Sequence, residues 1–138
     1  MNVIFISPHF PLHFYNFCDR LKRLGVNVLG IGDCPYDGLR QEVKDSVTEY
    51  YYVSSLEDYD QVMRATAFFT FKYGKIDYVE SQNEYWLELE AKLRTDFNVQ
   101  NGWRSEDMKA IKLKSQMKKG YKRAKVKTAR HLLITKKR

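Results

Sequence analysis

The sequence predicts an α/β protein: an open parallel sheet with helices on both faces, followed by a basic helix and a short strand. Two observations lead to this fold class. Short strand-like runs recur about every 25 residues, and apolar residues at helical spacing fill each gap between them. Strands that alternate with helices form parallel sheets, because each helix carries the chain back to the end where the preceding strand began.

The four strand-like runs are short and rich in β-branched or aromatic residues. They begin near Asn2, Val26, Tyr50 and Ile76, and they read NVIFIS, VNVLGI, YYYV and IDYVE. Such residues fit the pleated surface of a sheet that is covered on both sides. We therefore expect these four runs to be the strands of the sheet.

Four helices are predicted by apolar stripes. The stripes occupy residues 14–24, 39–47, 59–73 and 86–97. In the first, Phe14, Phe17, Cys18 and Leu21 follow the i, i+3, i+4, i+7 spacing that places side chains on one helix face. Gly25 follows this stripe, as expected where a helix ends. These helices connect successive strands.

The charge of the chain divides it into two parts. Residues 1–103 contain 10 Lys and Arg against 15 Asp and Glu, whereas residues 104–138 contain 14 against 2. A glycine-containing segment at residues 101–103 separates the parts. We therefore expect an α/β domain over residues 1–103 and the beginning of a second domain over residues 104–138.

The second part predicts one helix over residues 105–124 and a short strand over residues 132–135. Ala110, Leu113, Met117 and Tyr121 lie on one face of the helix, and lysines cover the rest. A helix this basic suits nucleic acid, because cations neutralise phosphates. However, no aromatic residues alternate with the lysines to stack on bases, so nucleic acid is not the expected partner.

Polar residues gather where the predicted strands end. In an open parallel sheet, ligands bind beyond the carboxyl ends of the strands, where loops and helix N-termini converge. The candidate substrate cleft comprises Ser7, His9, Asp33, Ser81, Asn83 and Glu84. A purely structural interpretation remains open for part of this set, in which Ser81 or Asn83 caps the fourth helix and Glu84 complements its dipole.

Other motifs argue against self-sufficient catalysis or metal binding. Gly30-Ile31-Gly32 follows a strand but lacks the third glycine of a dinucleotide site. Pro11 interrupts the helical spacing of His9 and His13, so we expect no metal site there. No nucleophile lies at a recognisable spacing from a base. We therefore predict no catalytic residue.

The cellular location is predicted from what the sequence lacks. No apolar run approaches the roughly 20 residues that span a bilayer, and no basic stretch precedes an apolar N-terminal segment as in a secretory signal. Cys18 and Cys34 form neither a CxxC pair nor a metal-binding spacing, which is typical of free thiols in a reducing compartment. We expect a cytoplasmic protein without a membrane partner.

Residues 107–134, DMKAIKLKSQMKKGYKRAKVKTARHLLI, resemble the start of an ATP-grasp domain, as in biotin carboxylase and the large chain of carbamoyl-phosphate synthase. Where this chain reads RAKVKTAR, that superfamily tends to read KAGVPTPR. The stretches NVIFISPHFP, VNVLGIGDCPYD and IDYVESQNEYWLELEAKLRTDFNV look like a bacterial carbamoyl-phosphate-synthase-like branch. The resemblance covers essentially the whole chain and implies a Rossmann-like pre-ATP-grasp domain over residues 1–103.

The resemblance implies the N-terminal portion of an ATP-dependent ligase. Lys114 stands where the family places a lysine that contacts ATP phosphate, although Leu113 replaces the usual aspartate before it. Lys125 and Lys127 replace the glycine and proline of the family's turn. ATP and Mg2+ would act in the full-length enzyme, and neither is expected to bind this chain tightly alone.

The expected partner is the remainder of an ATP-grasp domain. A homodimer through the C-terminal helix and strand is a second expectation, since an unpaired strand edge favours self-association. The chain would form one wall of the substrate and ATP cleft without being catalytic by itself. The alternative function is that of a stand-alone α/β module that binds a small ligand or regulates another protein.

Overall fold

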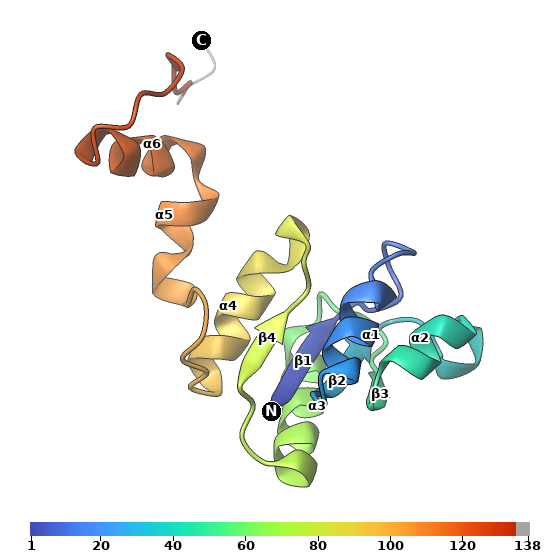
Figure 1. The fold of residues 1–138 in the computed structure, drawn as a ribbon. Coiled ribbons are helices and arrows are strands. Elements are labelled where there is room, and N and C mark those ends of the chain that lie inside the picture. Colours follow the sequence, from blue (N-terminus) through green and yellow to red (C-terminus); the bar gives the residue numbers. More distant parts are fainter. Residues whose placement is uncertain (135–138) are drawn as a thin grey trace.

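Four parallel strands form one sheet in the order β3-β2-β1-β4. The computed structural model describes residues 1–134 (Figure 1). The strands are β1 (Asn2–Ile6), β2 (Asn27–Gly32), β3 (Glu49–Tyr52) and β4 (Tyr78–Glu80). Each corresponds to one of the predicted runs, and the parallel pairing confirms the predicted fold class.

Strand β1 lies in the centre of the sheet and is buried along its whole length. Ile4 pairs with Leu29 of β2 on one side and with Val79 of β4 on the other. Because helices cover both faces, β1 reads as a continuous apolar run rather than an alternating one. The register therefore places the most hydrophobic strand where burial is most complete.

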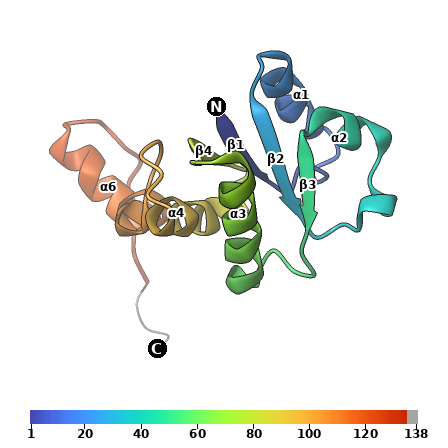
Figure 2. The same cartoon turned by 90° about the horizontal axis from the view of Figure 1, so that it is seen from below.

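Helices α3 (Tyr59–Tyr73) and α4 (Leu87–Asp96) cover one face of the sheet (Figure 2). This face contains the larger core, formed by Ile4, Ile6, Leu29, Ile31, Val53, Leu56, Val62, Ala65, Phe69, Ile76, Val79, Leu93 and Val99. The 3-10 turn η2 (Glu84–Trp86) leads directly into α4.

Helices α1 (Tyr15–Arg23) and α2 (Gln41–Ser46) cover the opposite face. Their smaller core is built from Phe5, Cys18, Val28 and Val47. A 3-10 turn, η1 (Tyr36–Gly38), precedes α2. Gly25, which was expected to end the first helix, has φ +79°, a left-handed conformation that favours glycine. The predicted arrangement of helices on both faces is confirmed.

The prediction of one helix over residues 105–124 is wrong. The segment forms the 3-10 turn η3 (Ser105–Asp107) and two helices, α5 (Met108–Lys112) and α6 (Lys114–Arg123). Leu113 lies between them with extended backbone (φ −83°, ψ +109°). A straight helix would carry its few apolar residues away from any core, whereas the break lets Ala110 and Ile111 share a surface with Met117 and Tyr121.

The predicted strand over residues 132–135 is not formed in its described part. Residues 131–134 have no regular secondary structure, and Thr135 lies outside the described residues. Leu132, Leu133 and Ile134 are 87%, 62% and 79% exposed. A strand needs a neighbour for its backbone hydrogen bonds, and no segment within residues 1–134 pairs with this one. None of the helices within residues 1–134 has both the length and the hydrophobicity of a membrane span.

Candidate functional site

The carboxyl ends of the strands meet at one edge of the sheet, and the predicted site residues follow them. Ser7 comes directly after β1, Asp33 after β2 and Ser81 after β4. The chain runs from β1 outward through β2 and β3, then crosses to β4 on the other side of β1. The strand order therefore reverses between β1 and β4, which is where open α/β sheets form a ligand crevice.

Ser7 holds the loop after β1 in place. Its φ is +56°, its N–H donates to the carbonyl oxygen of Ile31 at 2.8 Å, and its Oγ donates to the carbonyl oxygen of Phe10 at 3.0 Å. The residue is buried. Both polar groups of Ser7 therefore bind the protein itself, and Ser7 shapes the edge of the site.

His9 and Asp33 lie together at the same edge. His9 Nε2 is 3.2 Å from Asp33 Oδ1. Gly32 permits this approach, because a Cβ there would lie 2.9 Å from His9 Nδ1 and 2.5 Å from the hydroxyl of Tyr50. His9 also lines a small cavity of about 200 Å3 with Cys34. The structure thus brings together two residues that are 24 positions apart in the sequence.

We expect His9 to make the stability of the fold depend on pH. Burial lowers the pKa of its imidazole below 6.5, and the nearby Asp33 opposes this only in part; Asp33 is 40% exposed, so solvent screens its charge. As the pH falls, the His9 imidazole is therefore protonated in the unfolded chain before it is protonated in the folded one. The contribution of His9 to stability is fully present above the unfolded pKa and is lost as the pH falls through the lower folded pKa.

This prediction is tested by urea denaturation at a series of pH values between about 7 and 5. A His9→Asn variant is expected to lose less stability over this range than the wild-type chain. His13→Asn is the matched control, since His13 is exposed. An unchanged pH dependence in His9→Asn would show that the imidazole titrates alike in both states.

Ser81 and Asn83 form a local cap after β4. The N–H of Asn83 donates to Ser81 Oγ at 3.0 Å, and Asn83 Oδ1 accepts a hydrogen bond from the N–H of Tyr85 at 3.0 Å. Ser81 is fully buried and is hydrogen-bonded to the carboxylate of Glu90. These contacts fit the capping interpretation of Asn83, with η2 rather than α4 as the capped element.

The structure reveals a buried ion pair that the sequence analysis missed. Arg94 Nη2 lies 2.8 Å from Glu90 Oε2, and each side chain is 4% exposed. Arg94 also donates to the carbonyl oxygens of Val79 and of Trp103, the latter at 3.2 Å. Burial raises the pKa of Glu90, although the hydrogen bond with Ser81 and the charge of Arg94 partly offset it. The pair ties α4 to β4 and to the segment at residues 101–103 that separates the two parts of the chain.

Glu84, which follows Asn83, lies on the wall of a groove between α3, α4 and α5. We call this the acidic-aromatic groove; it has a volume of about 700 Å3. Its residues are Leu56, Glu57, Tyr59, Glu84, Tyr85, Trp86, Glu88, Leu89, Lys92 and Lys112. The groove combines loops after β3 and β4 with Lys112 at the end of α5, so both parts of the chain contribute to it.

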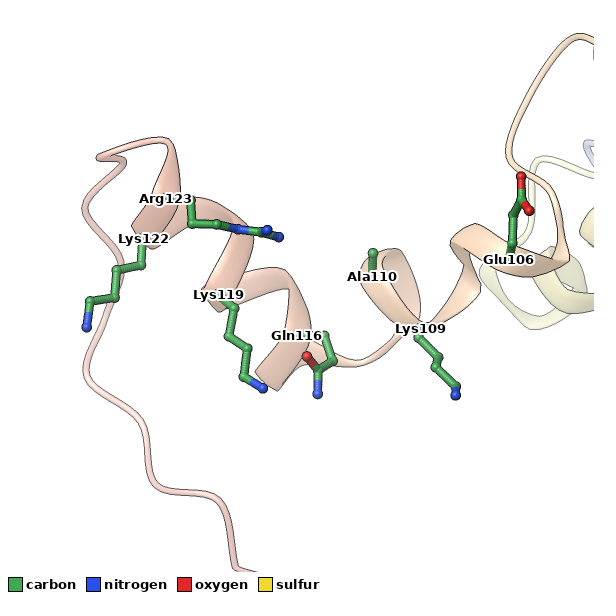
Figure 3. A pocket seen from close by; sticks show the side chains of 7 residues that line it. All are labelled: Glu106, Lys109, Ala110, Gln116, Lys119, Lys122 and Arg123. Atoms are coloured by element: carbon green, nitrogen blue, oxygen red, sulfur yellow. The ribbon is translucent and has the colours of Figure 1, made fainter.

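A second groove, between α5 and α6, carries the opposite charge (Figure 3). This basic groove has a volume of about 840 Å3 and is lined by Glu106, Lys109, Ala110, Gln116, Lys119, Lys122 and Arg123. Lys109, Gln116 and Lys119 project to the same side in Figure 3. Lys114 begins α6 and is exposed, so its ammonium group is accessible to a ligand.

The turn after α6 contains Lys125, one of the two residues that depart from the resembling motif. Lys125, which replaces the family's glycine, has φ +58°. Its N–H donates to the carbonyl oxygen of Lys122 at 3.1 Å, and the N–H of Val126 donates to that of Tyr121 at 2.9 Å. This is the left-handed helix ending in which glycine is common. A lysine in this conformation carries some cost in backbone strain.

The fold matches a solved structure, the crystal structure of an L-amino acid ligase from Bacillus licheniformis, with a TM-score of 0.66 and 19% sequence identity. The match covers 92% of this chain and 31% of the ligase, so the chain spans about a third of the length of that protein. At this identity the likeness establishes the fold. No protein-family model and no curated protein matches the sequence significantly.

Proposed function

We propose that this chain is the N-terminal portion of an ATP-grasp ligase and that it contributes one wall of the substrate and ATP cleft. The observation that carries this proposal is the fold match to an L-amino acid ligase over 92% of the chain. The resemblance of residues 107–134 to the start of an ATP-grasp domain supports it independently. The substrate cleft would involve the strand edge that carries His9 and Asp33 together with the groove that carries Glu84.

In this proposal Lys114 contacts an ATP phosphate. It is the first residue of a helix of ten residues, where backbone N–H groups and the helix dipole attract anions. An ammonium group at this point adds a positive charge that can bind phosphate oxygens. The exposed position of Lys114 is compatible with that role.

The described residues contain no ready cluster of metal ligands for magnesium. Within residues 1–134, no group of three His, Cys, Asp or Glu side chains could hold a metal ion. Mg2+ neutralises charge on transferred phosphoryl groups in ATP-dependent ligation. We therefore propose that its ligands belong to the remainder of an ATP-grasp domain, and we assign no step of the reaction to the residues described here.

The same remainder is the proposed partner of the C-terminal segment. Leu132, Leu133 and Ile134 are exposed without a strand beside them in the described part of the chain. Apolar side chains of this kind are stabilised when a neighbouring sheet covers them. We also propose, from the sequence, that two such segments pair in a homodimer. The same holds for a carbamoyl-phosphate-synthase-like reaction and for a cytoplasmic location.

Calorimetric titration with Mg-ATP tests the proposed function. We expect the 138-residue chain to bind weakly or not at all, and the polypeptide encoded by the whole reading frame to bind ATP. In the longer polypeptide, Lys114→Ala is expected to weaken binding about tenfold, by loss of a charge-assisted phosphate contact. Lys75→Ala is the matched control, since Lys75 is exposed on the α/β body.

Two outcomes would contradict this proposal. Tight ATP binding by the 138-residue chain would identify a complete nucleotide-binding module, which corresponds to the alternative of a stand-alone α/β protein. Equal binding by wild-type and Lys114→Ala forms of the longer polypeptide would remove Lys114 from the phosphate site.

A further inference from the structure

We propose that the acidic-aromatic groove binds an organic ammonium group. It combines carboxylates, which neutralise the charge of such a cation, with aromatic rings, whose faces attract it. The side chains concerned are Glu57, Glu84, Glu88, Tyr59, Tyr85 and Trp86. A volume of about 700 Å3 is ample for an alkylammonium substituent and part of the molecule that carries it.

One carboxylate of the groove is available to an external cation. Glu57 accepts a hydrogen bond from the hydroxyl of Tyr85 at 2.5 Å, and Glu88 lies 3.2 Å from the ammonium of Lys112. Glu84 is exposed and makes no side-chain hydrogen bond or ion pair within residues 1–134. The Glu57–Tyr85 hydrogen bond raises the pKa of Tyr85.

The aromatic rings of the groove already hold one ammonium group. Lys92 Nζ lies 3.6 Å from the centre of the Tyr59 ring, and the hydroxyl of Tyr59 donates to Asp96 at 2.5 Å. Two further rings, those of Tyr85 and Trp86, meet edge to face with their centres 4.7 Å apart. Tyr85 is 63% exposed and accessible to a ligand, whereas Trp86 is partly buried against the larger core. The groove thus offers the same kind of cation site beside the free carboxylate of Glu84.

The substrate class follows if the chain belongs to a ligase, so this part of the inference rests on the proposed function. An amine that attacks an activated carboxylate must be uncharged, and an ammonium group held by Glu84 cannot be the attacking group. We infer that the groove holds a second amine of a substrate, one that stays protonated at neutral pH. Polyamines and amino acids with an amine in the side chain have such a second group, whereas substrates with a single amine do not.

The groove can be tested on the complete 138-residue chain without nucleotide. The probe is n-butylammonium chloride, and 1-butanol is its neutral counterpart of similar size. The chain has two tryptophans. Trp86 lines the groove, whereas Trp103 does not line it and is 56% exposed. The indole N–H signal of Trp103 therefore serves as a control within the same molecule. Both signals are followed by 15N–1H nuclear magnetic resonance.

We expect the Trp86 signal to shift in a saturable way with butylammonium but not with butanol, while the Trp103 signal stays in place. Glu84→Gln is expected to weaken binding about three- to fivefold, the effect of losing one partly exposed charge contact. Glu106→Gln makes the same change at an exposed glutamate of the basic groove and should leave the affinity unchanged.

Equal shifts with butanol would overturn the inference, because they would indicate an apolar surface without cation recognition. Shifts of both tryptophans, or of neither, would overturn it as well. None of these outcomes depends on ATP. A chain that binds butylammonium through Glu84 but shows no ATP binding in the longer polypeptide would retain the cation site and lose only the assignment to a ligase.

Discussion

Arg94→Met is expected to lower the free energy of unfolding by about 3–5 kcal/mol, because it leaves a buried carboxylate without its cation. The side chains of Arg94 and Glu90 are each 4% exposed, and the separation of 2.8 Å allows a direct hydrogen bond. Methionine has a similar shape, so packing is largely kept. The carbonyl oxygens of Val79 and Trp103 also lose a donor. Urea denaturation followed by circular dichroism measures the effect.

The control for this prediction is an ion pair with the same spacing on the surface. Arg64 Nε lies 2.7 Å from Asp60 Oδ2 on α3, and these side chains are 71% and 59% exposed. Arg64→Met should therefore cost less than about 0.5 kcal/mol. Adding Glu90→Leu to Arg94→Met should recover much of the lost stability, since the unpaired charge is then gone. Similar costs for the two Arg→Met variants would show that the buried pair contributes little.

Phe69→Ala is expected to cost about 3–5 kcal/mol, the usual range for a large aromatic side chain removed from a core. Phe69 is completely buried, and its ring lies 6.1 Å from that of Tyr51 and 6.2 Å from that of Tyr73. Its removal therefore leaves a cavity between α3 and the sheet. The midpoint and slope of urea denaturation report the change in stability and whether unfolding stays cooperative.

Phe71 offers a control two positions away on the same helix. It is 91% exposed, so Phe71→Ala should change stability by less than about 0.5 kcal/mol, despite an identical change in composition and helix propensity. A similar loss in both variants would mean that the effect comes from the helix itself rather than from the core. A large gap between them would confirm that the apolar face of α3 is the one that contacts the sheet.

The strands and crossover helices could be predicted because their signals are local. Val3 to Ile6 are buried on both sides, so any sequence that forms this strand must be apolar throughout. Likewise, the stripe that contains Phe69 needs the period of a helix to reach the core. The edge that carries Ser7, His9 and Asp33 followed from the same logic, since parallel strands place all their carboxyl ends together.

Other features depend on partners that are remote in sequence. The break at Leu113 arises because the basic segment has no core to support a long helix, and helical spacing alone does not reveal this. The exposed run at residues 132–134 has the residue types of a strand, yet a strand forms only where a neighbour accepts its hydrogen bonds. The i, i+4 spacing of Glu90 and Arg94 predicts an ion pair on one helix face. It does not predict burial, because exposed pairs such as Asp60 and Arg64 have the same spacing.

The sequence by itself therefore determined the α/β class, the parallel strands and the edge at which polar residues gather, because periodicity and burial act over a few residues. Only the tertiary structure decided which charges are buried together and which side chains share a groove. Glu57 and Tyr85 are 28 positions apart and meet only when α3 and α4 pack on the same face of the sheet. Burial and charge compensation are properties of that packing, so they become visible only once the chain has folded.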